Sequence, residues 1–335
     1  MNFKNKRGNM INVISDTNCS SPKGIILSVH GIGSHFQPSS YTHQYDNKGR
    51  ALLFNNAGYL SYAIELEGHG KSEGKRCFIR SFDDLIDDVN QLILNLKDKH
   101  HLPIFLIGFS MGGAICIHFL IKKQRNLVNG SILMAPMCGI KESMKPSQPV
   151  QYILKFLSYF FPDKPWVPGS DKEFIRKCSP NQDYVESKKD DIYGYKNNHR
   201  LATAYSCLDA CNFISTNYKK FLFPVLIIHG DNDVVTDFKS SEKFYNNIES
   251  PDKQFLPIKN GYHNLLIQGH KNDKNPEIIF NHILSWIEER VNKNNIILND
   301  LREDSYYSKN NLFIFIISGL VLILSIIFFI LFRIL

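Results

Sequence analysis

The chain lacks paired cysteines and recognisable metal-binding motifs. Its seven cysteines are scattered and odd in number, with no C-x-x-C pair, and its histidines form no H-E-x-x-H. These absences argue against a disulfide framework and a zinc site, and they fit a reducing compartment. The cysteines are Cys19, Cys77, Cys116, Cys138, Cys178, Cys207 and Cys211.

A strong charge of one sign is also absent. The chain has 39 basic and 32 acidic residues, spread along its length. This diffuse excess is too weak to predict a nucleic-acid partner and slightly favours an anionic membrane surface. The basic N-terminal residues Lys4, Lys6 and Arg7 are not followed by an apolar segment. We therefore expect no secretory signal.

Long hydrophobic runs are missing until the C-terminus. Residues 312–332 carry no charge. As a helix, about 21 residues span about 30 Å, the thickness of the hydrocarbon core of a bilayer. This segment therefore predicts a transmembrane helix, and residues 291–311 a short polar tether. Without a secretory signal, the pattern predicts a tail-anchored protein whose globular part lies in the cytosol. A glycolipid anchor would require entry into the secretory pathway, so the missing signal argues against it.

The middle of the chain contains a serine with a glycine two residues away on either side. Gly108-Phe109-Ser110-Met111-Gly112 follows the apolar run 103–107 and precedes the apolar stretch 114–117. This pattern predicts a strand, a sharp turn and a helix, with the serine at the apex. Glycine is needed two residues to either side, where only hydrogens fit. The Met111 N–H, at the start of the helix, can then face an oxyanion.

Three further segments place polar residues just after apolar strands. The first, at 25–33, ends in a glycine-rich turn that can supply a second N–H, that of Ile32. The second, at 223–233, ends in a loop with two aspartates, Asp231 and Asp233. The third places His263 in a turn after the strand 254–258. The carboxyl ends of parallel strands form the ligand-binding edge of a sheet, so these residues indicate a Ser, Asp, His catalytic set.

On these motifs the chain resembles the α/β-hydrolase superfamily and, within it, the monoacylglycerol lipase and lysophospholipase group. Residues 65–74, Glu-Leu-Glu-Gly-His-Gly-Lys-Ser-Glu-Gly, are similar to the D-x-x-G-H-G-x-S-x-G stretch of that group. Glu65 replaces the usual aspartate, a conservative change. His69 in this turn is interpreted as structural. The resemblance covers residues 22–140 and 220–290 and is weak between them.

The resemblance implies a role for each site residue. Ser110 is the nucleophile and His263 the general base. The H-G-x-x-D spacing of the group falls on Asp233, which makes it the orienting acid, with Asp231 and Asp237 as rivals.

The oxyanion donors that the resemblance implies are the backbone N–H groups of Ile32 and Met111. Such a site performs two-step acyl transfer and needs neither a metal nor an organic cofactor.

The expected fold is α/β: a mostly parallel central sheet with helices on both faces, an inserted cap and a C-terminal transmembrane helix. The cap contains the aromatic stretch 152–161, which can line an acyl-chain pocket, touch a bilayer or pack against the body. The polar stretch 183–198 is interpreted as a solvated loop. The expected divisions are a polar extension (1–21), the core (22–138 and 219–290), the cap (139–218), the tether (291–311) and the membrane helix (312–332).

The leading hypothesis is a membrane-tethered serine hydrolase acting on lipid esters with a single acyl chain, either monoacylglycerols or lysophospholipids. A carboxylesterase for small soluble esters is the alternative, and a peptidase of this fold is a further one. A non-catalytic membrane adaptor is the hypothesis of another class. Epoxide hydrolases and dehalogenases need a carboxylate at the turn, so Ser110 argues against them.

Overall fold

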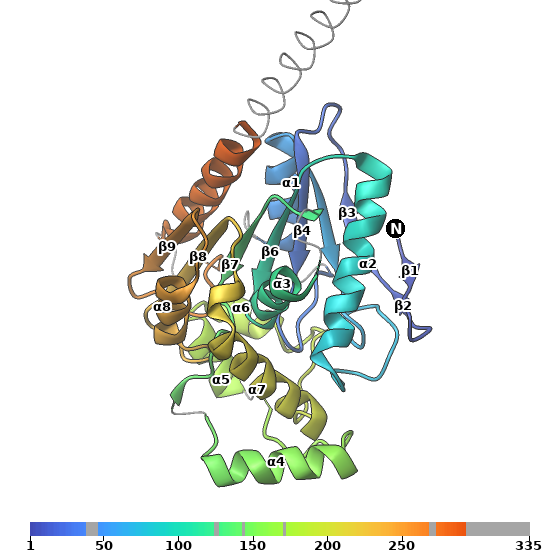
Figure 1. The fold of residues 1–335 in the computed structure, drawn as a ribbon, viewed down its shortest axis with the longest axis vertical. Coiled ribbons are helices and arrows are strands. Elements are labelled where there is room, and N and C mark those ends of the chain that lie inside the picture. The colour runs from blue at the N-terminus through green and yellow to red at the C-terminus, as the bar shows by residue number, and fades with distance from the viewer. Residues whose placement is uncertain (38–45, 124–126, 143–144, 170–171, 268–272, 293–335) are drawn as a thin grey trace, which may run out of the picture. The chain divides into compact units, whose positions relative to one another are not determined.

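The computed structural model describes residues 1–37, 46–123, 127–142, 145–169, 172–267 and 273–292. Within these residues a seven-stranded sheet has the order β3-β5-β4-β6-β7-β8-β9 (Figure 1). The strands of the sheet are β3 (Val13–Asp16), β4 (Gly24–Val29), β5 (Tyr59–Ile64), β6 (Ile104–Phe109), β7 (Gly130–Met134), β8 (Val225–Gly230) and β9 (Lys253–Ile258).

The sheet is parallel from β5 to β9, and only the β3–β5 pair is antiparallel. The central strands β6, β7 and β8 are buried on both faces, which explains their continuous apolar sequences. Helices α2 (Phe82–His100), α3 (Met111–Lys122) and α8 (Phe238–Asn247) cover one face. The other face is covered by α1 (Asn47–Asn56) and a helix that begins at residue 275, which meet where Phe54 contacts Phe280. The predicted mostly parallel sheet between helices is confirmed.

The N-terminal residues belong to the sheet, which corrects the expected boundary after residue 21. Val13 to Asp16 form the edge strand β3 and pair with Ser61 to Ile64 of β5. Before it, β1 (Phe3–Lys4) and β2 (Met10–Ile11) form a small hairpin. A strand of four residues at a sheet edge has too short a pattern to reveal its alternation, so the sequence did not predict it.

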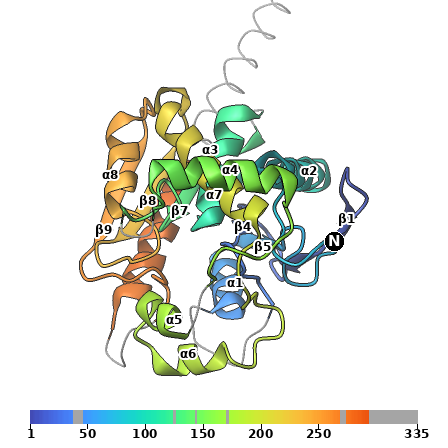
Figure 2. The same ribbon diagram turned by 90° about the horizontal axis from the view of Figure 1, so that it is seen from below.

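Among the described residues between β7 and β8 are the helices α4 (Gln148–Phe160), α5 (Lys172–Cys178), α6 (Gln182–Ser187) and α7 (Leu201–Thr216). A short 3₁₀ turn, η3 (Tyr218–Lys220), leads back to β8. These helices lie beyond the carboxyl ends of the strands, with α4 packed on α7 (Figures 1 and 2). The inserted segment therefore faces the edge of the sheet at which the predicted site residues gather.

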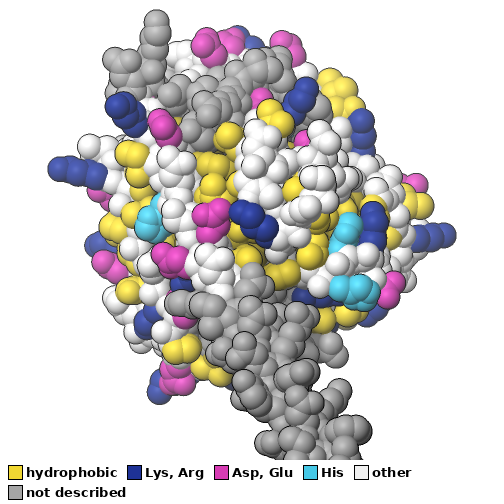
Figure 3. Space-filling model, turned by 90° about the horizontal axis from the view of Figure 1, so that it is seen from above, with side chains coloured by type: hydrophobic (Ala, Val, Ile, Leu, Met, Phe, Trp, Pro, Cys, Tyr) yellow, Lys and Arg dark blue, Asp and Glu magenta, His cyan; other side chains and the backbone are white. Residues whose placement is uncertain are grey.

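The C-terminal part of the chain divides from the rest at residue 288. In the part of the chain that the structure describes, no helix is both long and apolar enough to cross a membrane. The predicted transmembrane helix at 312–332 and most of the tether lie outside the described residues. On the face drawn in Figure 3, acidic and basic side chains are interspersed, in keeping with the diffuse charge of the sequence.

Candidate active site

Ser110 lies on a strained turn between β6 and α3. Its φ of +53° is uncommon for a residue with a side chain. The N–H of Ser110 donates to the carbonyl oxygen of Met134 on the neighbouring strand at 3.0 Å, which holds the turn in place. A Cβ atom added to Gly112 would lie 2.1 Å from the carbonyl oxygen of Val29, and one added to Gly108 would lie 2.6 Å from that of Gly112. The spacing of the glycines therefore has the steric reason that the sequence suggests.

Of the candidate acids, Asp233 is the one that the structure brings to the histidine. Nδ1 of His263 lies 2.7 Å from Oδ2 of Asp233, whose side chain is fully buried. Asp231 is exposed to solvent in the same loop. Asp237 caps α8 by accepting a hydrogen bond from the N–H of Ser240. Asp231 therefore faces solvent and Asp237 caps a helix, whereas Asp233 pairs with His263.

The carboxylate of Asp233 is held by a network that the sequence did not reveal. Its Oδ1 accepts from the N–H groups of Val235 at 2.7 Å and Thr236 at 3.2 Å. Its Oδ2 accepts from the Thr236 hydroxyl at 2.8 Å and lies 3.1 Å from Nε2 of His229. Burial alone would raise the pKa of Asp233, but the charges and hydrogen bonds of His263 and His229 outweigh burial and hold the pKa well below its usual range. The carboxylate therefore stays ionised beside His263.

Ser110 and His263 line one cavity of about 470 Å³. The turn after β4 forms another wall, and it packs closely on the serine: a Cβ added to Gly31 would lie 3.1 Å from Cβ of Ser110. The next residue is Ile32, whose N–H is one predicted oxyanion donor. The other donor belongs to Met111, the first residue of α3, where backbone N–H groups have no partner within the helix. The loop and the helix thus converge on Ser110.

The turn at residues 65–74 supports this wall through the carboxylate of Glu65. The carboxylate is buried and accepts from the N–H of Phe36 at 3.2 Å, the side chain of Gln37 at 2.9 Å and the N–H of Lys71 at 2.7 Å. The longer side chain thus ties the loop after β4 to its neighbouring turn. His69 is buried in this turn, and burial lowers its pKa to about 4, in keeping with a structural role.

The polar stretch 183–198, interpreted as a solvated loop, instead forms a wall of the cavity. Asp191 is nearly buried, and its carboxylate contacts His35 and the ammonium group of Lys188. Tyr184 and Tyr195 also line the cavity. The interpretation from composition was wrong here, because composition does not show that the Asp191 carboxylate pairs with His35, a residue from a distant part of the chain.

The fold and the converging serine, histidine and aspartate are those of an α/β-hydrolase with a serine nucleophile. The chain belongs to the serine aminopeptidase S33 family, whose model matches residues 20–269. This match, together with the esterase and lipase relatives described next, confirms the predicted resemblance and the prediction of a serine ester hydrolase. Among the described residues, no group of three or more histidine, cysteine or acidic side chains could hold a metal ion.

Individual relatives agree with this assignment. The chain is 28% identical over 274 residues to caffeoylshikimate esterase of Arabidopsis thaliana, covering 81% of this chain and 79% of the relative. It is 28% identical to monoglyceride lipase of Saccharomyces cerevisiae, covering 80% and 86% of the two chains. The solved structure of a soluble variant of that lipase, in complex with a substrate analogue, aligns with a TM-score of 0.71 at 22% identity, over 87% of this chain and 94% of that one.

Proposed function

We propose that this protein hydrolyses the carboxylic esters of lipids with a single acyl chain, monoacylglycerols or lysophospholipids, at a membrane surface. The observation that carries the proposal is the 2.7 Å contact between His263 and the buried carboxylate of Asp233, on the wall of a cavity shared with Ser110. The names of the relatives, monoglyceride lipase and caffeoylshikimate esterase, support ester hydrolysis as the reaction.

The reaction follows from the roles of these three residues. Oγ of Ser110 attacks the ester carbonyl carbon while His263 accepts the hydroxyl proton, and Asp233 stabilises the imidazolium ion that forms. The N–H groups of Ile32 and Met111 face the oxyanion. His263 gives its proton to the departing alcohol. It then deprotonates a water molecule, which attacks the acyl-enzyme, and it returns the proton to Oγ of Ser110 as the carboxylic acid is released.

The exposed apolar face of α4 supports lipid as the substrate. No side chain of this helix is buried, although most are large and apolar. Packing against the body, one of the roles weighed for this stretch, includes the contact of α4 with α7. A cap with such a face can enter the headgroup region of a bilayer. The exposed residues are Val150, Tyr152, Ile153, Phe156, Tyr159 and Phe160.

The apolar segment at 312–332 adds an anchor to this proposal. A helix of that length spans the hydrocarbon core, and the tether at 291–311 keeps the catalytic domain at the cytosolic surface. A tethered enzyme meets its lipid substrate at a high local concentration. The carboxylesterase alternative predicts instead that soluble esters with short chains are preferred.

Labelling with a fluorescent fluorophosphonate tests the proposal. The full chain in neutral detergent is compared with Ser110→Ala and with Ser215→Ala, which removes an exposed serine on α7. We expect labelling of the wild type and of Ser215→Ala, and none of Ser110→Ala. Rates on monoacylglycerols of increasing chain length then separate a lipase from a general esterase. A folded wild type that is not labelled would overturn the proposal and favour the adaptor.

A further inference from the structure

The imidazole of His30 lies at the start of the loop after β4 and takes no part in the steps of the reaction. Its side chain is buried. Nε2 of the ring accepts a hydrogen bond from the N–H of Leu66 at 3.1 Å, and Nδ1 lies 2.7 Å from the carbonyl oxygen of Gly31. The ring therefore joins the turn at residues 65–74 to the loop that carries a predicted oxyanion donor.

These contacts fix the position of the hydrogen on the His30 ring. The backbone N–H of Leu66 can only donate, so Nε2 carries no hydrogen. Burial and the neighbouring His69 hold the pKa of His30 well below its usual range, although the contact with Gly31 opposes them, and the ring is neutral. A neutral imidazole carries a single N–H, which is therefore at Nδ1. Nδ1 donates this hydrogen to the carbonyl oxygen of Gly31.

The carbonyl group of Gly31 belongs to the same peptide unit as the N–H of Ile32. The peptide bond is trans, so its C=O and N–H lie in one plane and point in opposite directions. The Gly31 oxygen also accepts a hydrogen bond from the N–H of Ser34 at 3.3 Å. Because His30 and Ser34 both hold the oxygen, the direction of the Ile32 N–H is fixed as well.

The N–H of Ile32 is free to bind a ligand beside Ser110. Among the described residues, none accepts a hydrogen bond from it. A Cβ atom added to Gly31 would lie 3.1 Å from Cβ and 3.6 Å from Oγ of Ser110, so this peptide unit packs against the serine. A carbonyl group that accepts hydrogen bonds polarises its own peptide unit, which makes the N–H a stronger donor. The arrangement suits the binding of an oxyanion.

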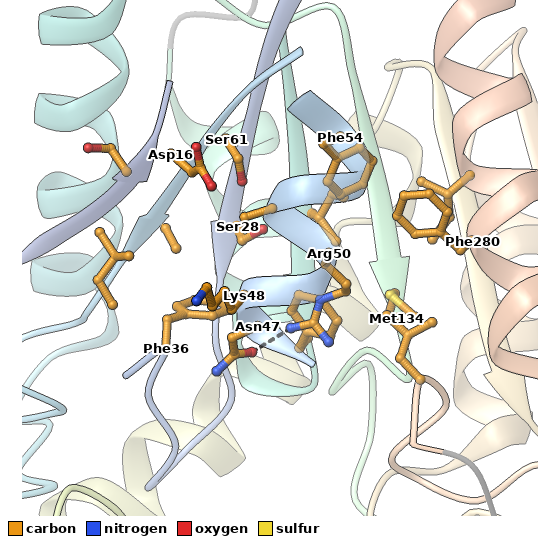
Figure 4. A pocket seen from close by; sticks show the side chains of 18 residues that line it. Asp16, Ser28, Phe36, Asn47, Lys48, Arg50, Phe54, Ser61, Met134 and Phe280 are labelled. Carbon is orange, nitrogen blue, oxygen red and sulfur yellow. Dashed lines mark hydrogen bonds between the residues drawn. The ribbon is translucent and has the colours of Figure 1, made fainter. Parts of the chain in front are cut away.

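Neighbouring aromatic rings hold the His30 imidazole in place. The ring of Phe36 packs edge-on against it, with ring centres 5.7 Å apart, and the ring of His69 lies at 5.1 Å. Phe36 lies on the wall of a cavity of about 230 Å³ (Figure 4), where its ring also contacts that of Phe109. The N–H of Phe36 donates to the carboxylate of Glu65. Rotating the imidazole would therefore break its two hydrogen bonds and disturb this packing.

We propose that His30 is a positioning residue for ester hydrolysis: its Nδ1 hydrogen holds the Gly31 carbonyl oxygen so that the N–H of Ile32, on the opposite edge of the same peptide unit, faces the oxyanion. The inference rests on the proposed function and adds to it the side chain that directs a backbone donor. Negative charge develops on the carbonyl oxygen only in the transition state. His30 therefore affects the rate of reaction and not the binding of the neutral ester.

Two substitutions separate the roles of the two ring nitrogens. His30→Asn places an amide nitrogen near the position of Nδ1 and can still donate to Gly31, whereas His30→Gln places its amide near the position of Nε2. Loss of one oxyanion donor costs about 10²-fold to 10³-fold in kcat, so a misdirected donor in His30→Gln should lower kcat about tenfold to hundredfold. We expect KM to stay within about twofold in both variants, and kcat of His30→Asn to stay within about threefold of the wild type.

The rates are measured on p-nitrophenyl butyrate with the full chain in neutral detergent. The control is His118→Gln, which makes the same change at another buried histidine. The ring of His118 lies on α3 and packs against Phe82 and Phe213. This variant should leave both kcat and KM unchanged.

A trifluoromethyl ketone tests the oxyanion contact without turnover. The carbonyl carbon of 1,1,1-trifluorohexan-2-one accepts Oγ of Ser110 to form a hemiketal, and the oxyanion of this adduct takes the place of the one in the reaction. We expect its Ki to rise in His30→Gln by the same factor by which kcat/KM falls. In His30→Asn the Ki should stay close to that of the wild type.

The hydrogen on the His30 ring can be located in the wild type itself. Nitrogen NMR of the chain labelled with ¹⁵N-histidine distinguishes a protonated ring nitrogen from an unprotonated one, and the His30 signals are those missing from His30→Asn. We expect the hydrogen on Nδ1. A hydrogen on Nε2 would overturn the inference, and this measurement decides it even where His30→Gln does not fold.

Three kinetic results would also overturn the inference. They are equal losses of kcat in His30→Asn and His30→Gln, a loss confined to KM, and a Ki of the ketone that His30→Gln does not change. If hydrolysis by the wild type does not depend on Ser110, the proposed function itself fails. A Ser110-dependent rate that is equal in the wild type and His30→Gln instead overturns only the role of His30.

Discussion

The imidazole of His35 contacts both carboxylate oxygens of Asp191, 156 residues further along the chain. Nε2 of His35 lies 2.8 Å from Oδ1 and 2.9 Å from Oδ2. A second link is close by, because the N–H of Tyr195 donates to the carbonyl oxygen of Gly33 at 2.9 Å. These contacts join the inserted segment to the loop that carries the Ile32 N–H.

This connection predicts that Asp191 affects the rate of reaction more than the binding of a small ester. Asp191→Asn weakens the link to His35 and loosens the loop that carries the Ile32 N–H. Small displacements of a catalytic group lower the reaction rate strongly. We expect kcat for p-nitrophenyl butyrate to fall about tenfold with KM within about twofold. Asp190→Asn, at an exposed neighbouring position, is the control. An unchanged kcat in Asp191→Asn would show that the contact does not position the loop.

The assignment of the acid predicts a large difference between two aspartates in one loop. Asp233→Asn removes the charge that stabilises the His263 imidazolium ion, and we expect kcat to fall about 10³-fold to 10⁴-fold, as in other triads. Asp231→Asn, at an exposed position, should change kcat less than about twofold. Steady-state rates on a soluble ester provide the measurement. Inactivity of Asp231→Asn with an active Asp233→Asn would reverse the assignment.

The lowered pKa of Asp233 predicts how stability depends on pH. The folded protein binds this proton less readily than the unfolded chain, whose aspartates titrate near about 3.9. The contribution of Asp233 to stability is therefore fully present above that pH and is lost as the pH falls toward the folded value. Urea midpoints measured between about pH 5 and pH 2 should fall less steeply for Asp233→Asn than for the wild type. Asp231→Asn should follow the wild type, and parallel curves for all three proteins would contradict the prediction.

The apolar face of α4 predicts interfacial activity. Phe156 is 63% exposed and Tyr159 is 80% exposed. Burying a large apolar side chain in a bilayer contributes about 1.5–3 kcal/mol to the free energy of binding. Changing both to serine should lower the hydrolysis of monoolein in vesicles about tenfold or more, while hydrolysis of soluble p-nitrophenyl butyrate stays within about twofold. Ile192→Ser is the control, because Ile192 is 81% exposed but lies outside α4. An equal loss on both substrates would point to misfolding of the inserted segment rather than to membrane contact.

The sequence predicted those parts of the fold that rest on local patterns. Continuous apolar strands indicated the parallel sheet. The glycines around Ser110 indicated the turn, because the close approach of backbone to backbone leaves room for hydrogen only. Serine is a preferred residue at the start of a helix, and the side chain of Ser81 accepts from the N–H of Asp83 at the start of α2.

Features that depend on contacts between distant segments were not predicted. Asp191 was assigned to a solvated loop because composition does not reveal its pairing with His35. Thr236, a buried partner of Asp233, has no spacing signature of its own. His229, the other buried partner, is the penultimate residue of β8 and the histidine of the H-G-x-x-D spacing, so its place four residues before Asp233 is a signal in the sequence for this contact.

The position of β9 has a consequence for how activity is lost. Among the described strands, β9 lies at the edge of the sheet and pairs only with β8, and His263 follows it by five residues. Edge elements detach more readily than central ones, so we expect mild heat or denaturant to separate His263 from Ser110 while the central strands stay folded. Inactivation will therefore precede melting. A nascent chain will also remain inactive until β9 has emerged from the ribosome and joined the sheet, so the enzyme cannot hydrolyse esters before this strand has been made.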